Sequence, residues 1–228
     1  TVKLSVVMPI FNEERTLEEI VRRVLATKYE IDLVLVDDGS TDRSREIMKE
    51  LEAEHDGIRC FYHERNQGKG AALSTGFKEV VGDVVVIQDA DLEYDPQDYA
   101  ILLYPIEEGH ADVVYGSRFL GGRYVRVHLF WHYVGNRMLT LLSNMLTNLN
   151  LSDMETCYKA FRIDVARKLD IQSRSFAVEP EMTAKVARMG VRVYEVPIRY
   201  AGRDYSEGKK IGFKDAVLAV LAIIRWRF

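Results

Sequence analysis

The sequence has little of what marks several common protein classes. Its 228 residues include only two cysteines, Cys60 and Cys157, so a disulfide-stabilised scaffold is excluded and a reducing, cytoplasmic setting is expected. The longest apolar run, Ala216–Ile224, falls well short of the ~20 residues that a membrane-spanning helix needs. The first residues enter an apolar stretch at once, which is not typical of a signal peptide.

Familiar binding signatures are missing as well. No Cys and His residues have zinc-site spacing, and neither GxxxxGK[ST] nor GxGxxG occurs. The 31 Lys and Arg against 35 Asp and Glu give a formal net charge of −4, and this mild acidity disfavours a nucleic-acid partner. A chain that is 47% hydrophobic and 29% charged is typical of a globular protein with a sizeable core, here expected to be one domain over residues 1–228.

The first half alternates apolar runs with amphipathic stretches. Strands are expected at Leu4–Met8, Ile31–Val36, Ile58–His63, Asp83–Ile87 and Ala111–Tyr115. The segments between them have apolar residues at helical spacing, and the first helix is expected to open with a capping box of Thr16 and Glu19. This alternation predicts an α/β fold with a Rossmann-like, mostly parallel sheet flanked by helices.

Polar residues collect where these strands end. They are Asn12, Glu13, Asp37, Asp38, Asp89 and Asp91. The carboxyl ends of parallel strands share one rim, and ligands of open α/β sheets bind there. The sequence therefore predicts a site rich in carboxylates.

Asp89 and Asp91 are the sharpest feature of this rim. Two carboxylates at the end of an apolar strand need a partner, because a bare buried charge is costly. A divalent ion that also binds a substrate diphosphate would satisfy them, and Glu93 could supply a further oxygen. Capping of the loop by acidic residues is the alternative, and one DxD motif does not separate the two.

Three other segments suit a phosphate or a nucleotide. Arg118 ends the fifth strand, and arginine is the preferred bidentate phosphate ligand, although a surface ion pair would also explain it. The turn Asn66–Gly70 could bring backbone N–H groups and Lys69 to a diphosphate or a base. Asp37–Ser40 is either a β-turn or a site where a carboxylate accepts from base or ribose.

Together, five segments resemble the family 2 glycosyltransferases with the GT-A fold. They are Val7–Glu14, Val36–Asp42, Asn66–Gly70, Asp89–Leu92 and Gly116–Arg118. Each segment alone is weak evidence for this family, but the occurrence of all five in this order is specific to it. A narrower likeness to dolichol-phosphate mannose synthases and other polyprenyl-phosphate glycosyltransferases lies in Asp89–Pro96, Ser152–Arg162 and Gly202–Ile211.

The resemblance implies an inverting enzyme that needs Mg²⁺ or Mn²⁺. It would move a hexose from a nucleotide sugar, GDP-mannose before UDP-glucose, to a polyprenyl or dolichyl phosphate. The implied donor-binding residues are Pro9, Phe11, Glu13, Asp38, Lys69, Asp89, Ala90 and Asp91. The implied metal ligands are Asp89, Asp91 and Glu93. The implied acceptor-phosphate residues are Arg118, Arg137 and Arg203, and the implied catalytic residues are Asp91, Arg118, Asp153 and Arg203.

The resemblance also divides the chain. Residues 1–118 are expected to bind the nucleotide sugar and residues 119–228 the acceptor. Phe119–Asn150 and an amphipathic C-terminal helix, from about Phe213 to Phe228, are aromatic and basic. They either pack on the sheet or contact a membrane surface, and the resemblance favours the membrane. The implied location is peripheral, on the cytoplasmic face of a membrane, and a separate membrane-anchoring subunit is a further candidate partner.

Three other functions stay open. A family 2 enzyme could act on a saccharide or another hydroxyl acceptor, and Asp153 would then be the candidate general base. With a lipid phosphate, already an anion, Asp153 would mainly orient the donor sugar or the acceptor. A sugar-nucleotidyltransferase would carry a Gly-rich basic loop where Phe11–Glu14 stands, and a non-catalytic module would not need Asp91 with Arg118.

Overall fold

The computed structural model describes residues 2–121, 129–175, 177–202 and 213–227. The described strands form one seven-stranded sheet in the order β3-β2-β1-β4-β6-β5-β7. They are β1 (Lys3–Ile10), β2 (Glu30–Asp37), β3 (Ile58–Tyr62), β4 (Val84–Ile87), β5 (Val113–Ser117), β6 (Lys159–Arg162) and β7 (Val193–Pro197). Only β6 runs against its neighbours β4 and β5; the other pairs in this sheet are parallel.

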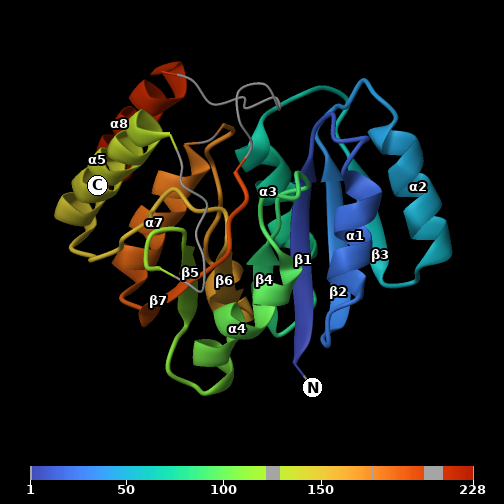
Figure 1. Ribbon diagram of the computed structural model, residues 1–228, viewed down its shortest axis with the longest axis horizontal. Helices are drawn as coiled ribbons and strands as arrows, with labels where there is room; N and C mark the ends of the chain where they lie inside the picture. Colours follow the sequence, from blue (N-terminus) through green and yellow to red (C-terminus); the bar gives the residue numbers. More distant parts are fainter. Residues whose placement is uncertain (1, 122–128, 176, 203–212, 228) are drawn as a thin grey trace.

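Helices cover the sheet and extend beyond one end of it (Figure 1). They are α1 (Leu17–Leu25), α2 (Ser44–Glu54), α3 (Lys69–Glu79), the 3₁₀ turn η1 (Pro96–Asp98), α4 (Tyr99–Glu107), α5 (Phe130–Thr147), α6 (Ile163–Ala166), α7 (Val178–Met189) and α8 (Phe213–Trp226). Helices α5 and α8 lie side by side at the end of the molecule opposite α2, and both pack on α7. Among the described residues, no helix is long and apolar enough to cross a membrane.

The expected α/β class with a mostly parallel sheet is confirmed. Apolar residues predominate in β1, β2 and β4, as expected for strands whose faces are covered by helices. Val6, Val34 and Val86 have no exposed surface. The five expected strands all form, most of them within two residues of the expected ends. The second half of the chain adds β6 and β7 to the same sheet.

The predicted capping box at the start of α1 is wrong. The Thr16 side chain caps no N–H group of the helix. Its hydroxyl instead donates to the Glu13 carboxylate at 3.1 Å, and Glu19 accepts from Arg22 and Arg23. The Thr16 hydroxyl therefore binds the Glu13 carboxylate, and the Glu19 carboxylate binds two arginines about one turn further along the helix. Neither side chain then bonds the backbone as a capping box requires.

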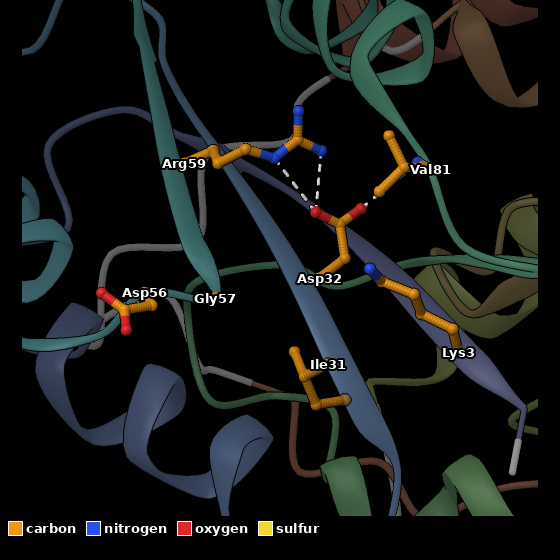
Figure 2. Close-up of a pocket in the computed structure, with 7 residues that line it drawn as sticks. All are labelled: Lys3, Ile31, Asp32, Asp56, Gly57, Arg59 and Val81. Carbon is orange, nitrogen blue, oxygen red and sulfur yellow. Dashed lines mark hydrogen bonds and ion pairs between the residues drawn. The ribbon is translucent and has the colours of Figure 1, made fainter.

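A hollow of about 310 Å³ lies at the amino ends of the strands, away from the predicted rim (Figure 2). Asp32 stands in its wall, and its Oδ1 accepts from Arg59 Nε at 3.1 Å and Nη2 at 2.7 Å. Its Oδ2 accepts from the Val81 N–H and the Ser5 hydroxyl. Since both carboxylate oxygens are occupied by groups that tie β1, β2 and β3 together, we assign this cluster a structural role.

Candidate active site

The direction of β6 brings the second half of the chain to the predicted rim. Asp89 and Asp91 follow β4, and Arg118 follows β5, at the carboxyl ends of those strands. Because β6 is antiparallel to both, its amino end lies at the same edge. Residues 153–158, which lead into β6, therefore face the loops after β4 and β5.

Asp38 shapes the loop that was predicted to approach a nucleotide. Its side chain is buried, and its Oδ1 accepts from the Gln67 N–H at 2.9 Å and contacts His63 Nδ1 at 2.8 Å. Its Oδ2 accepts from the Gly68 N–H at 2.7 Å. Gly68 has φ +97°, a conformation that favours glycine. Asp38 thus fixes the backbone of this loop, and its contact with a nucleotide stays a prediction.

Lys69 joins two elements that are far apart in the sequence. Its Nζ lies 2.9 Å from Asp89 Oδ1 and 3.3 Å from Glu179 Oε1 on α7. Glu179 also pairs with the fully buried Lys159 of β6. Burial alone would lower the pKa of Lys69, but the anions around it, Asp89 foremost, raise it well above its ordinary value. A permanent positive charge therefore sits beside the Asp89 carboxylate.

Arg118 and Asp153 form a bidentate ion pair. Arg118 Nε and Nη2 each lie 2.7 Å from one carboxylate oxygen, and the Arg118 N–H donates to the same group at 3.0 Å. Asp153 has no exposed surface, whereas 13% of the Arg118 side chain is exposed. The Tyr200 ring lies 5.1 Å from the guanidinium carbon. A carboxylate held by three donors and closed to solvent is poorly suited to accept a proton from a substrate.

The turn that carries Asp153 is held from two further sides. Glu195 on β7 accepts from the Ser152 N–H at 2.9 Å and from the Asp153 N–H at 3.1 Å. Arg137, on α5, donates to the Ser152 carbonyl at 3.3 Å. Arg137 therefore contacts the residue that precedes Asp153, and its role at an acceptor phosphate stays a prediction.

The three predicted metal ligands are not gathered into a cage. Asp91 Oδ1 accepts from the Glu93 N–H at 3.1 Å, and Glu93 Oε2 accepts from the Tyr200 hydroxyl at 2.5 Å. Asp89 is paired with Lys69. Within the described ranges, no three His, Cys, Asp or Glu side chains come together as metal ligands. The oxygen donors still suit Mg²⁺ or Mn²⁺, which take one or two carboxylates and complete their shell with phosphate oxygens and water.

The remaining predicted residues are spread along the rim. Pro9 lies in β1, and Phe11 and Glu13 follow that strand. Glu13 faces the start of α1, where it accepts from Thr16. Ala90 is buried between the two aspartates, and Arg203 lies outside the described residues.

Sequence reasoning missed the partners that come from α7, β6 and β7. They are Lys159, Glu179, Glu195 and Tyr200. No pattern in the sequence singled out Glu179. The contacts of Lys159, Glu195 and Tyr200 depend on the order and direction of the strands, which the local sequence does not indicate.

A substitution at Gly70 tests how the turn Asn66–Gly70, which is predicted to approach a nucleotide, is held in place. A Cβ on Gly70 would lie 2.0 Å from the Ser173 carbonyl oxygen, and the Gly70 N–H donates to the Arg174 carbonyl at 2.9 Å. We expect Gly70→Ala to force the 66–70 and 173–175 segments apart and to lower the affinity for a nucleoside diphosphate at least tenfold, measured by calorimetry. Gly135→Ala is the control, because a Cβ there meets no atom within 4 Å. Equal affinities of the Gly70→Ala and Gly135→Ala variants for the nucleoside diphosphate would show that the contact with residues 173–175 does not shape the turn Asn66–Gly70.

Crystal structures of glucosyl-3-phosphoglycerate synthase from Mycobacterium tuberculosis share the fold of this chain. One, in complex with Mn²⁺, uridine diphosphate and phosphoglyceric acid, has a TM-score of 0.71 at 21% identity and covers 99% of this chain and 77% of that one. Another contains Mg²⁺ and uridine diphosphate, with a TM-score of 0.69. The architecture is thus the GT-A fold of glycosyltransferases.

The family itself is shown by sequence. The family described as "Glycosyl transferase family 2" matches residues 5–170, and the chain belongs to it and is a glycosyltransferase. It is 30% identical to an undecaprenyl-phosphate mannosyltransferase from Micrococcus luteus, over 98% of this chain and 93% of that protein. It is 34% identical, over 90% of its length, to an undecaprenyl-phosphate 4-deoxy-4-formamido-L-arabinose transferase from Edwardsiella ictaluri, of whose length it covers 62%.

Proposed function

We propose that this protein transfers a hexose from a nucleotide sugar to a polyprenyl phosphate at a membrane surface. The observation that carries the proposal is the acceptor shared by two relatives. Their names give different sugars but the same lipid phosphate, undecaprenyl phosphate. The relative matched over nearly its whole length is a mannosyltransferase, which favours GDP-mannose over UDP-glucose as the donor.

The charges at the rim suit this reaction. An oxygen of the acceptor phosphate attacks the anomeric carbon from the face opposite the nucleotide. The bond from that carbon to the diphosphate oxygen breaks, and the nucleoside diphosphate leaves with the electron pair, so the configuration inverts. Arg118, with Arg137 beside it and Arg203 as the third member, binds the acceptor phosphate. Since that phosphate is already an anion, positioning supplies much of the rate and Asp153 acts by holding Arg118 in place.

A divalent metal is part of the proposal. Asp91 would hold Mg²⁺ or Mn²⁺, with Asp89 and Glu93 as supporting oxygens. The ion would neutralise the charge that builds on the departing diphosphate. Lys69, fixed by Asp89 and Glu179, adds a second positive charge on the donor side.

Residues 1–118 would bind the donor and residues 119–228 the acceptor. The loops after β1, β2 and β4, which carry the predicted nucleotide residues, all come from the first part. Asp153 and Arg137 come from the second, and Arg118 stands at the boundary.

The exposed face of α5 and α8 supports contact with a lipid surface. On α5, Trp131, Met138 and Met145 are 78%, 67% and 72% exposed and share one face. Leu221 and Ile224 are exposed apolar side chains on α8, which packs against α5. Helix α5 contains no Asp or Glu, as expected for a helix at an anionic lipid surface. Because α5 also carries Arg137, the lipid-facing helix reaches the proposed phosphate site.

The membrane contact predicts a loss of vesicle binding. We expect Trp131→Glu combined with Met145→Glu to reduce sedimentation with undecaprenyl-phosphate vesicles containing anionic lipid by at least tenfold, because two charges would have to enter the interface. Turnover of a detergent-dispersed short-chain acceptor should persist. Tyr104→Glu, at a position 59% exposed on α4, is the control. Undiminished sedimentation of the double variant would exclude this face as the contact.

The proposed reaction is tested by transfer from labelled GDP-mannose and UDP-glucose. We expect label to enter undecaprenyl phosphate only in the presence of Mg²⁺ or Mn²⁺, through a phosphodiester link that releases the sugar in mild acid. Parallel reactions offer 3-phosphoglycerate and an oligosaccharide. Transfer to the oligosaccharide but not to the lipid would favour the hydroxyl-acceptor alternative, and turnover of 3-phosphoglycerate alone would favour a soluble phosphate acceptor.

A further inference from the structure

Glu155 is a carboxyl group that forms no ion pair with any described residue, and it lies in the turn between Asp153 and Cys157. Glu155 stands in the turn that leads into β6, two residues after Asp153 and two before Cys157. Asp153 pairs with Arg118 on the acceptor side, and the buried Cys157 follows before β6 begins. The Glu155 side chain is half-buried. Its Oε1 is closed to solvent and has no hydrogen-bond partner in the part of the chain that the structure describes.

Among the described residues, the two cations whose charge acts on Glu155 are committed to other groups. Arg118 is paired with Asp153, and Lys159 is paired with Glu179. Lys69, which also contacts Glu179, is paired with Asp89. In the part of the chain that the structure describes, these three cations thus face three carboxylates, and Glu155 is a fourth. Burial, reinforced by the negative charge of Glu179, raises the pKa of Glu155 to about 7.

Unsatisfied polar atoms cluster at this place. In the described residues, the buried side-chain oxygens without a hydrogen bond include Thr156 Oγ1 and Glu179 Oε1 as well as Glu155 Oε1. Of these, Glu179 Oε1 still has Lys69 at 3.3 Å. Buried polar atoms are rarely left without a partner, since each unpaired atom loses its hydrogen bonds to water and destabilises the folded protein. Their concentration beside the reaction site indicates that a bound molecule completes the hydrogen bonding.

The chemistry of that molecule follows from the donors it must supply. A carboxylate oxygen needs a hydrogen-bond donor, and a phosphate offers only acceptors and a negative charge that Glu155, Glu179 and Asp89 would repel. A sugar ring offers hydroxyl groups, which donate and accept. The hydroxyl-bearing part of the donor is therefore the part that suits this acidic stretch, while the phosphates suit Lys69 and Arg118.

We propose that Glu155 binds a hydroxyl group of the donor sugar and thereby takes part in choosing the hexose. The inference rests on the proposed function, because it assumes a nucleotide-sugar donor. A site built to hydrogen-bond a hydroxyl rejects an analogue that lacks it or points it elsewhere, since the buried carboxyl is then left unpaired. Glu155 is thus a specificity-determining residue, distinct from the groups that bind the phosphates.

The test compares a nucleotide sugar with its nucleoside diphosphate. For Glu155→Ala we expect at least a tenfold weaker affinity for GDP-mannose in the presence of Mn²⁺, with the affinity for GDP unchanged within twofold. Glu155→Gln should lose less than threefold, because the neutral amide still hydrogen-bonds. A series of GDP-mannose analogues, each lacking one hydroxyl, should include one that weakens binding to the wild type but not to Glu155→Ala. Glu50→Ala, an exposed glutamate on α2, is the control.

Each contrary outcome has its own meaning. Equal weakening of GDP-mannose and GDP by Glu155→Ala would show a structural role and overturn the proposal, and so would unchanged binding of both. Deoxy analogues that all lose affinity equally in wild type and variant would also overturn it. If the wild type binds GDP and UDP but neither GDP-mannose nor UDP-glucose, or binds no nucleotide at all, the proposed function is wrong. The proposal for Glu155 then fails for that reason, because it assumes a nucleotide-sugar donor.

Discussion

Replacing Asp91 by alanine should lower sugar transfer by at least about 10²–10³-fold, the range seen when one group that stabilises a developing charge is removed. The Asp91 carboxylate follows β4, is partly exposed, and accepts from the Glu93 N–H at 3.1 Å. Because this side chain is not part of the buried core, its loss should disturb the fold little. What the variant loses is the oxygen that would hold the metal against the diphosphate.

The measurement pairs activity with ligand-induced stabilisation. Mn²⁺ added together with a nucleoside diphosphate should raise the melting temperature of the wild type by mass action, and should leave that of Asp91→Ala unchanged. Asp56→Ala, an exposed acid at the opposite edge of the sheet, should behave as the wild type. If Asp91→Ala keeps both its metal-dependent shift and its turnover, Asp91 is not the ligand and the proposed metal site is wrong.

The part of the site that the sequence could predict is the part built by adjacent residues. Asp89 and Asp91 follow an apolar strand, and the end of a parallel strand fixes the rim on which they lie. The same holds for Arg118 after β5. To place these residues, it is enough to predict the strands and their parallel direction. Both follow from strongly apolar runs that alternate with segments whose apolar residues have helical spacing.

The partners of these residues could not be predicted, because long-range pairing selects them. Arg118 and Asp153 are 35 positions apart, and they meet only because β6 enters the sheet between β4 and β5 in the opposite direction. Nothing in the local pattern of Lys159–Arg162 indicates that direction. The capping box at Thr16 is wrong for a local reason instead, since Glu13 offers that hydroxyl a stronger partner than the helix does.

Topology also changes what Asp153 can do. From the sequence it was the best candidate for a general base if the acceptor were a hydroxyl. In the structure its carboxylate is closed to solvent and bound by the Arg118 side chain and backbone. A group so placed stabilises the guanidinium and fixes its direction, which agrees with an acceptor that brings its own negative charge.

Removing Arg118 should therefore damage both the fold and the reaction. Arg118→Ala leaves the Asp153 carboxylate buried without its counter-charge, and breaking a buried pair in this way costs about 3–5 kcal/mol of unfolding free energy. Chemical denaturation should show a loss of this size. Asp153→Asn should cost less, because the amide oxygen still accepts from the Arg118 side chain, and turnover should fall while donor binding persists.

The double variant Arg118→Met with Asp153→Asn separates the two roles. With neither charge present, no uncompensated ion is buried. The loss of unfolding free energy in the double variant should therefore be smaller than the summed losses of Arg118→Met and Asp153→Asn alone, by a coupling of roughly 0.5–3 kcal/mol. Turnover should stay absent, because the guanidinium that binds the acceptor phosphate is gone. Recovered turnover would mean that Arg118 serves the fold alone. If Asp153→Asn by itself abolishes turnover, keeps donor binding and removes the acidic limb of the pH profile, then Asp153 is a proton acceptor and the acceptor is a hydroxyl.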